Sequence, residues 1–125
     1  MSELNIEATE RTPAITLSGP PWRLSLSGES YPEDVSAFYG PVILALDEIV
    51  ASAAHAMRAE LSLVYINSSS IKALYRIFEG LDLCRQKGQR IEVCWHHTED
   101  DDIMQELGED LQERFPELTI LIESQ

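Results

Sequence analysis

The chain has 125 residues, of which 44% are hydrophobic and 25% charged, and 9 Lys and Arg against 22 Asp and Glu give a net charge of −13. This length and composition suit one folded domain with one hydrophobic core, so we expect a single domain over residues 1–125. Such a negative protein repels phosphate backbones and anionic lipid. The charge therefore argues against nucleic-acid binding and direct membrane binding, and favours a partner protein with a basic patch.

The first twelve residues lack the basic and apolar regions of a signal peptide, and no apolar run has the length of a membrane span. Cys84 and Cys94 lack the short spacing of a metal knuckle or a redox pair, which favours buried thiols in a reducing compartment. We therefore expect a cytoplasmic protein.

The first predicted elements are two strands and a helix. Residues 14–17 and 22–26 alternate at period two around a Gly-Pro-Pro turn, which predicts an antiparallel pair. Ser30 with Glu33 resembles a capping box, with Pro32 in the first turn of an amphipathic helix that extends to residue 53. Pro41 is expected to kink or interrupt this helix.

The apolar run at residues 61–66 predicts a central strand that is covered on both faces. Helical spacing follows over residues 71–84, with Gly88 as a left-handed stop. A strand at 91–95, a helix capped by Thr98 and Asp101, and a strand at 118–122 complete the order β-β-α-β-α-β-α-β. The predicted fold class is α/β, a mixed sheet with helices packed on it.

The polar turn formed by Asn67, Ser68, Ser69 and Ser70 is the main candidate site, because ligand sites in open α/β sheets lie at the carboxyl ends of strands. Capping by Ser68 or Ser69 would explain one hydroxyl. The others would stay near helix N–H groups that favour an anion, such as a covalent phosphate. The chain has neither a nucleophile elbow nor a Gly-rich phosphate loop, and these residues alone do not distinguish Ser68 from Ser69 as the phosphoacceptor.

His96 and His97, followed by acids, suggest an alternative: a small metal-dependent enzyme. The spacing argues against it, because adjacent residues on a strand point to opposite faces. From Glu99 to Glu113 there are eight acids and no bases, a pattern typical of a solvated helix face that could also meet a basic partner or a weakly bound divalent cation. The remaining large aromatic residues are expected in the core; they are Trp22, Trp95, Tyr65, Phe38 and Phe78.

The element order, with a serine at the start of the helix after the third strand, resembles the STAS domains of anti-sigma factor antagonists, which are switched by phosphorylation at that place. An anti-sigma antagonist in a partner-switching pathway is therefore a further alternative. A more specific resemblance is to the SiaC family of regulatory phosphoproteins. It is carried by residues 6–13, 28–33, 38–41, 65–70 and 95–109.

The SiaC resemblance implies a bacterial, STAS-like cytoplasmic switch with no catalytic activity and no cofactor. When unphosphorylated, it would bind and stimulate a membrane-associated diguanylate cyclase, which raises cyclic di-GMP and favours aggregation or biofilm growth. Phosphorylation would end this binding. The resemblance also implies a dedicated serine/threonine kinase with a histidine-kinase-like ATPase fold and an opposing metal-dependent protein phosphatase.

The family's phosphoacceptor follows the Asn of the turn, which corresponds to Ser68 here; the best-known member has threonine at this place. Asn67, Ser69 and Ser70 would then shape the turn, and Lys72 would lie near the phosphate. Around His96 and His97 the chain departs from the family pattern.

Overall fold

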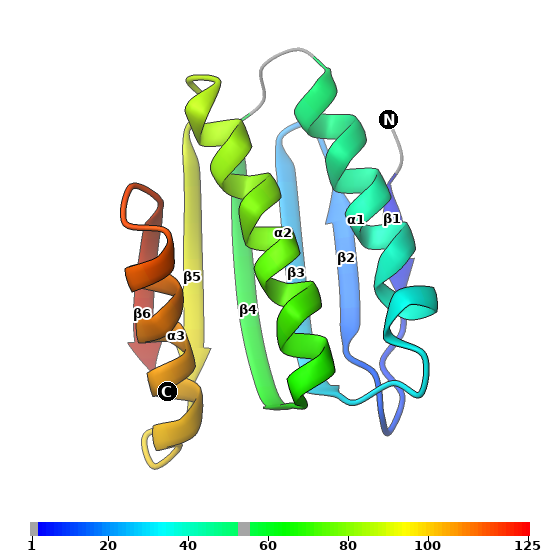
Figure 1. Cartoon of the computed structure of the whole chain (residues 1–125), viewed down its shortest axis with the longest axis vertical. Coiled ribbons are helices and arrows are strands. Elements are labelled where there is room, and N and C mark those ends of the chain that lie inside the picture. Colours follow the sequence, from blue (N-terminus) through cyan, green and yellow to red (C-terminus); the bar gives the residue numbers. More distant parts are fainter. Residues whose placement is uncertain (1–2, 53–55) are drawn as a thin grey trace.

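The computed structural model describes residues 3–52 and 56–125, which form two layers, a six-stranded sheet and three helices on one of its faces (Figure 1). The elements are β1 (Leu4–Ile6), β2 (Ala14–Ser18), β3 (Trp22–Ser30), α1 (Val35–Ala51), β4 (Met57–Ile66), α2 (Ser68–Gln86), β5 (Ile91–His97), α3 (Asp102–Arg114) and β6 (Thr119–Ser124). The prediction of an α/β fold is confirmed. It missed β1, a three-residue edge strand that is too short for a period-two pattern to stand out.

The strands follow one another across the sheet in sequence order. β1, β2 and β3 pair antiparallel, whereas β3 to β6 pair parallel. Each parallel pair is joined by one helix, as right-handed crossovers require a connection of this length. The predicted mixed sheet is confirmed, with β4 at its centre. Among the described residues, no helix is long and apolar enough to cross a membrane.

β4 is covered on one face only, so the expectation of cover on both faces is wrong. Met57, Ala59 and Leu61 are buried under the helices, whereas Arg58 and Glu60 lie between them on the helix-free face and are partly exposed. The sequence prediction missed this alternation because the apolar run at 61–66 covers only the second half of β4, whereas the alternating residues lie in its first half. The core lies between sheet and helices, and its largest fully buried side chains are Trp95, Tyr39 and Phe78, with Trp22 at 3% exposure also part of it.

Aspartates, rather than hydroxyl residues, cap two of the helices. The side chain of Asp34 accepts a hydrogen bond from the Ala37 N–H at 3.0 Å, so α1 begins beyond both Ser30 and Pro32. Asp101 caps α3 in the same way by accepting from Met104, in place of Thr98. A carboxylate both accepts this bond and complements the helix dipole, so Asp is the stronger cap.

α1 passes through Pro41 without interruption and ends at Ala51, so its predicted end at residue 53 lies outside the described residues. At the end of α2, Gly88 has φ +91°, which confirms the predicted left-handed stop.

Candidate functional site

Asn67 organises the turn between β4 and α2. Its side-chain oxygen accepts a hydrogen bond of 2.9 Å from the Ser70 N–H, and its own N–H donates to the Ser30 carbonyl at 3.0 Å. Asn67 is therefore the N-cap, so the alternative in which Ser68 or Ser69 caps the helix does not hold. The hydroxyls of Ser68 and Ser69 are consequently left without a capping role.

The three serines occupy the first turn of α2 and have different surroundings. Ser68 and Ser69 are exposed, whereas Ser70 is fully buried and its hydroxyl has no hydrogen-bond partner. The N–H groups of Ser68 and Ser69 also lack intrahelical acceptors, as helix geometry dictates, and the positive end of the helix dipole lies here. This end of α2 therefore presents two accessible hydroxyls in a setting that stabilises an added anion.

A buried hydrogen bond supports the turn from below. The hydroxyls of Ser30, at the end of β3, and Tyr39, in α1, are 2.6 Å apart, and both residues are almost completely buried. Burial raises the pKa of Tyr39, and the hydrogen bond with Ser30 opposes part of this rise. Because Asn67 is bonded to the Ser30 carbonyl, this contact fixes the serine turn relative to α1.

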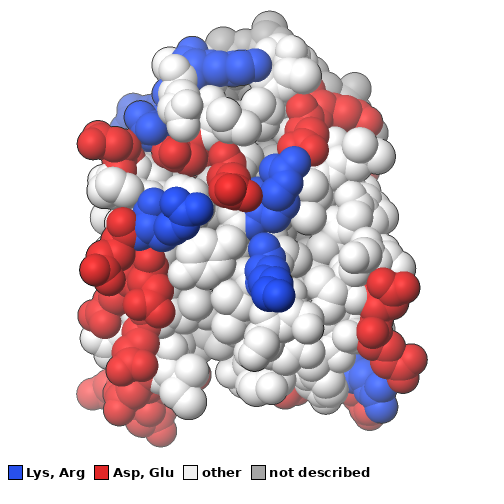
Figure 2. All heavy atoms as spheres, viewed as in Figure 1, with Lys and Arg blue, Asp and Glu red and all other residues white. Residues whose placement is uncertain are grey.

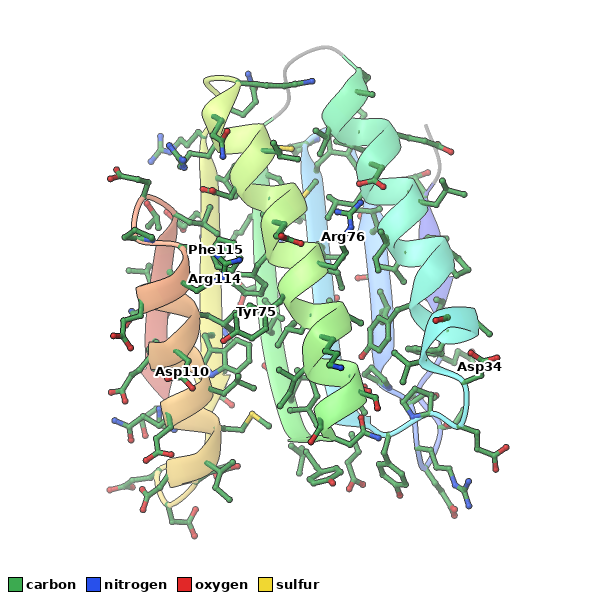
Figure 3. The ribbon with its side chains drawn as sticks, in the orientation of Figure 1. Asp34, Tyr75, Arg76, Asp110, Arg114 and Phe115 are labelled. Carbon is green, nitrogen blue, oxygen red and sulfur yellow. The ribbon has the colours of Figure 1, made fainter. Side chains whose placement is uncertain are left out.

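A groove of about 570 Å³ lies between α1 and α2, next to the turn. Its walls include Val35, Ile43 and Leu44 from α1, and Ser69, Lys72 and Ala73 from α2. The structure therefore places Lys72, predicted to lie near the phosphate, at this groove. Farther along α2, Arg76 points toward α1 and its Nη2 is 3.0 Å from Asp47 Oδ2 (Figure 3). Asp47 also lines the groove, so this ion pair bridges the two helices at the groove but not beside the serines.

Two exposed apolar side chains precede the turn because of an irregularity in β4. The register with β3 changes from Gly28 opposite Leu63 to Glu29 opposite Tyr65, which leaves Val64 as an extra residue. Val64 and Tyr65 are therefore 67% and 49% exposed, and the prediction that Tyr65 is buried is wrong.

Tyr65 packs edge to face against Tyr31, with ring centroids 5.7 Å apart. These aromatic residues join the site from positions that sequence reasoning missed. The one signal for them was Gly28, which lies two residues beyond the predicted strand at 22–26 and inside β3, and whose φ of +116° suits an irregular strand. Of the other aromatic residues expected in the core, Trp22, Trp95 and Phe78 are buried, and Phe38 is partly buried.

His96 and His97 point to opposite sides of β5, as strand alternation predicts. His96 Nε2 is 2.7 Å from Glu60 Oε2 on the helix-free face, whereas the buried His97 has its Nδ1 2.7 Å from the Thr98 carbonyl. The hydrogen bond with His96 holds the pKa of Glu60 below its usual range, with Arg58 contributing and burial opposing. In residues 3–52 and 56–125, no group of three or more His, Cys, Asp and Glu side chains is placed to hold a metal ion. The geometry thus gives no support to a metal site built on both histidines.

α3 presents an acidic face to solvent, and Figure 2 shows red atoms gathered along it, whereas blue atoms lie over the middle of α2. Its other side packs on the sheet, and Phe115, directly after α3, meets α2, where Tyr75 reaches toward it with ring centroids 6.2 Å apart (Figure 3). Burial raises the pKa of Tyr75, and the nearby Asp110 adds to the rise. The prediction of a solvated acidic helix face is confirmed.

The sequence comparisons place this site in a known context. A model of the SiaC family of regulatory phosphoproteins matches residues 6–125. The chain belongs to the SiaC family. It is 35% identical over 113 residues to an uncharacterised protein of Pseudomonas aeruginosa strain UCBPP-PA14, a match that covers 90% of each chain. The family resemblance in the sequence is therefore confirmed.

Solved structures agree with this assignment. The crystal structure of apo-SiaC from Pseudomonas aeruginosa matches with a TM-score of 0.89 and 34% identity, over 99% of this chain and 100% of that one. A chain from the crystal structure of the diguanylate cyclase SiaD in complex with its activator SiaC matches with a TM-score of 0.92 and 32% identity, over 98% and 99% of the two chains. The SiaC fold is thus preserved across the whole chain.

Proposed function

We propose that this SiaC-family member is a regulatory protein without catalytic activity that, when unphosphorylated, binds and activates a diguanylate cyclase. Cyclic di-GMP then rises and promotes aggregation or biofilm growth. The observation that carries the proposal is the match, with a TM-score of 0.92, to a chain of the structure in which SiaC is described as the activator of SiaD. The two exposed serines beside a groove supply a place where such binding can be regulated.

Ser68 is the proposed phosphoacceptor. It is the first residue of α2, it is exposed, and Asn67 rather than its own hydroxyl caps the helix. A phosphate adds about −1.5 to −2 charges, which the N-terminus of a helix stabilises without a change of fold. Ser70 is completely buried, so a kinase could reach it only after local unfolding. Ser69 is exposed as well but lines the groove, so a charge there would also change the groove. Ser18, which is exposed at the end of β2 and outside the groove, is therefore the control.

The proposal includes two further enzymes that act on this chain, a kinase with a histidine-kinase-like ATPase fold and a metal-dependent phosphatase.

We also propose that the protein is located in the cytoplasm. This location is supported by Cys84 and Cys94, which are both buried free thiols, as is usual in a reducing compartment.

The test is capture from the native bacterium with tagged wild type, Ser68→Ala, Ser68→Asp and the control Ser18→Asp, followed by mass spectrometry of the bound proteins. We expect wild type, Ser68→Ala and Ser18→Asp to capture a diguanylate cyclase and Ser68→Asp to lose it. If burial of the added charge costs about 3 kcal/mol, affinity falls roughly a hundredfold. Equal capture by the wild type and all three variants would remove Ser68 as the switch. Capture of an anti-sigma kinase without any cyclase would overturn the proposed activity.

Phosphorylation itself is measured on the protein isolated from cells by peptide mass spectrometry. A phosphate on Ser68 that disappears in Ser68→Ala supports the assignment. A phosphate found on Ser69 alone contradicts it.

A further inference from the structure

We propose that the groove between α1 and α2 receives an apolar segment of the diguanylate cyclase that carries a carboxylate, and that Lys72 makes this docking sensitive to phosphorylation of Ser68. This inference rests on the proposed function and specifies where and how the partner binds.

The groove has the shape and lining of a docking site for apolar side chains. Its volume is about 570 Å³, and one wall carries Leu44, which is 62% exposed, beside Val35 and Ile43. An exposed leucine next to a hollow gains much from being covered, because both its own surface and the groove lining leave water. Ile103 on α3 is even more exposed at 77%, but it lies in the acidic stretch and outside the groove.

The charge at the groove indicates what accompanies the apolar segment. Lys72 lines the groove and is exposed, and in the described part of the chain it forms no ion pair, whereas Arg76 one turn later is paired with Asp47. In a protein of net charge −13, an unpaired ammonium group beside an apolar groove is the feature most complementary to a partner's Asp or Glu.

Lys72 also connects the groove to the phosphorylation site. Ser68 and Lys72 are four residues apart on α2, a spacing that places their side chains next to each other. A phosphate on Ser68 would attract the Lys72 ammonium group and place about −1.5 to −2 charges beside the partner's carboxylate. Phosphorylation would therefore remove the attraction and add repulsion at the same edge of the groove.

The first test uses the cyclase that the wild type captures. Once purified, its affinity is measured for the wild type, for Leu44→Ser and for the matched control Ile103→Ser. Both changes shorten an exposed apolar side chain, so neither should disturb the core. We expect Leu44→Ser to weaken binding about tenfold or more, as loss of a central apolar contact does. The control should stay within about twofold of wild type.

The second test measures whether the effect of a negative charge at Ser68 on cyclase binding depends on Lys72. Lys72→Gln and the control Lys87→Gln, at the other end of α2, are each combined with Ser68→Asp. We expect Lys72→Gln alone to weaken binding several-fold and to reduce the additional effect of Ser68→Asp, whereas Lys87→Gln should do neither. Fully additive effects of Lys72→Gln and Ser68→Asp would overturn the coupling.

The outcomes separate this inference from the proposed function. If the wild type binds no diguanylate cyclase, both fall. If the wild type binds it and Leu44→Ser binds equally well, the groove assignment alone falls. Sedimentation of the isolated chain as a dimer that Leu44→Ser dissociates would assign the groove to a second copy and would also overturn the inference.

Discussion

Asn67 caps α2 through a hydrogen bond of 2.9 Å from the Ser70 N–H to its side-chain oxygen. The structural role in this turn therefore belongs to Asn67, and the hydroxyls of Ser68 and Ser69 are not needed for it. We predict that Asn67→Ala lowers the free energy of unfolding by about 1 kcal/mol, because an N-cap is lost. Ser68→Ala should change it by less than about 0.5 kcal/mol, as at other exposed positions. Urea unfolding of the three proteins measures both values. A larger loss in Ser68→Ala than in Asn67→Ala would contradict this division of roles.

The buried pair of Ser30 and Tyr39 predicts a strongly non-additive double-mutant cycle. Tyr39→Phe leaves the Ser30 hydroxyl, which is fully buried, without its partner at 2.6 Å and should cost about 1–3 kcal/mol. Ser30→Ala strands the phenol in the same way. Removing both hydroxyls leaves neither group stranded, so the double variant should lose less stability than the two single losses added together. Chemical unfolding of the four proteins checks this, and simple additivity would show that the two hydroxyls act independently.

The sheet and its helices were predictable because hydrophobic periodicity reports burial directly. The order of the helices and of all strands but β1 followed from it, as did the stop at Gly88. Hydrophobic periodicity does not show which of several polar residues caps the N-terminus of a helix. Ser30 and Thr98 fitted a capping pattern, but Asp34 and Asp101 lay closer to the helices and offered a carboxylate.

The candidate site was only partly predictable. The turn at residues 67–70 could be found because it is a short local motif. Tyr65 could not, because its exposure depends on the register between β3 and β4, which is set by pairing with a distant segment. The groove was also beyond sequence reasoning, because Leu44 and Lys72 lie on different helices and come together only in the folded chain.

The contact between His96 and Glu60 predicts a pH-dependent contribution to stability. The hydrogen bond from His96, together with Arg58, lowers the pKa of Glu60 in the folded protein. The contribution of Glu60 is therefore complete above the ordinary glutamate pKa of about 4.3, and it is lost as the pH falls through the lower folded-state pKa. The stability difference between wild type and Glu60→Gln should shrink from pH 6 to pH 3 in urea unfolding. A difference that stays constant over this range would contradict the linkage.

Gly108 predicts a steric cost where α3 crosses β5. A Cβ atom at this position would lie 2.7 Å from Trp95 Cδ1, and the indole cannot easily move because its Nε1 donates to the Met104 carbonyl at 2.9 Å. Alanine gains about 1 kcal/mol over glycine in helix propensity, but overpacking costs about 1–3 kcal/mol, so we expect Gly108→Ala to be destabilising on balance. Gln105→Ala, at an exposed position of the same helix, is the control, because it changes no buried contact. Urea unfolding should therefore show a loss of stability in Gly108→Ala and a change within about 0.5 kcal/mol in the control, and near-UV circular dichroism should change in Gly108→Ala alone. Stabilisation by Gly108→Ala would show that the indole can move aside and that the packing of α3 on the sheet is looser than this contact implies.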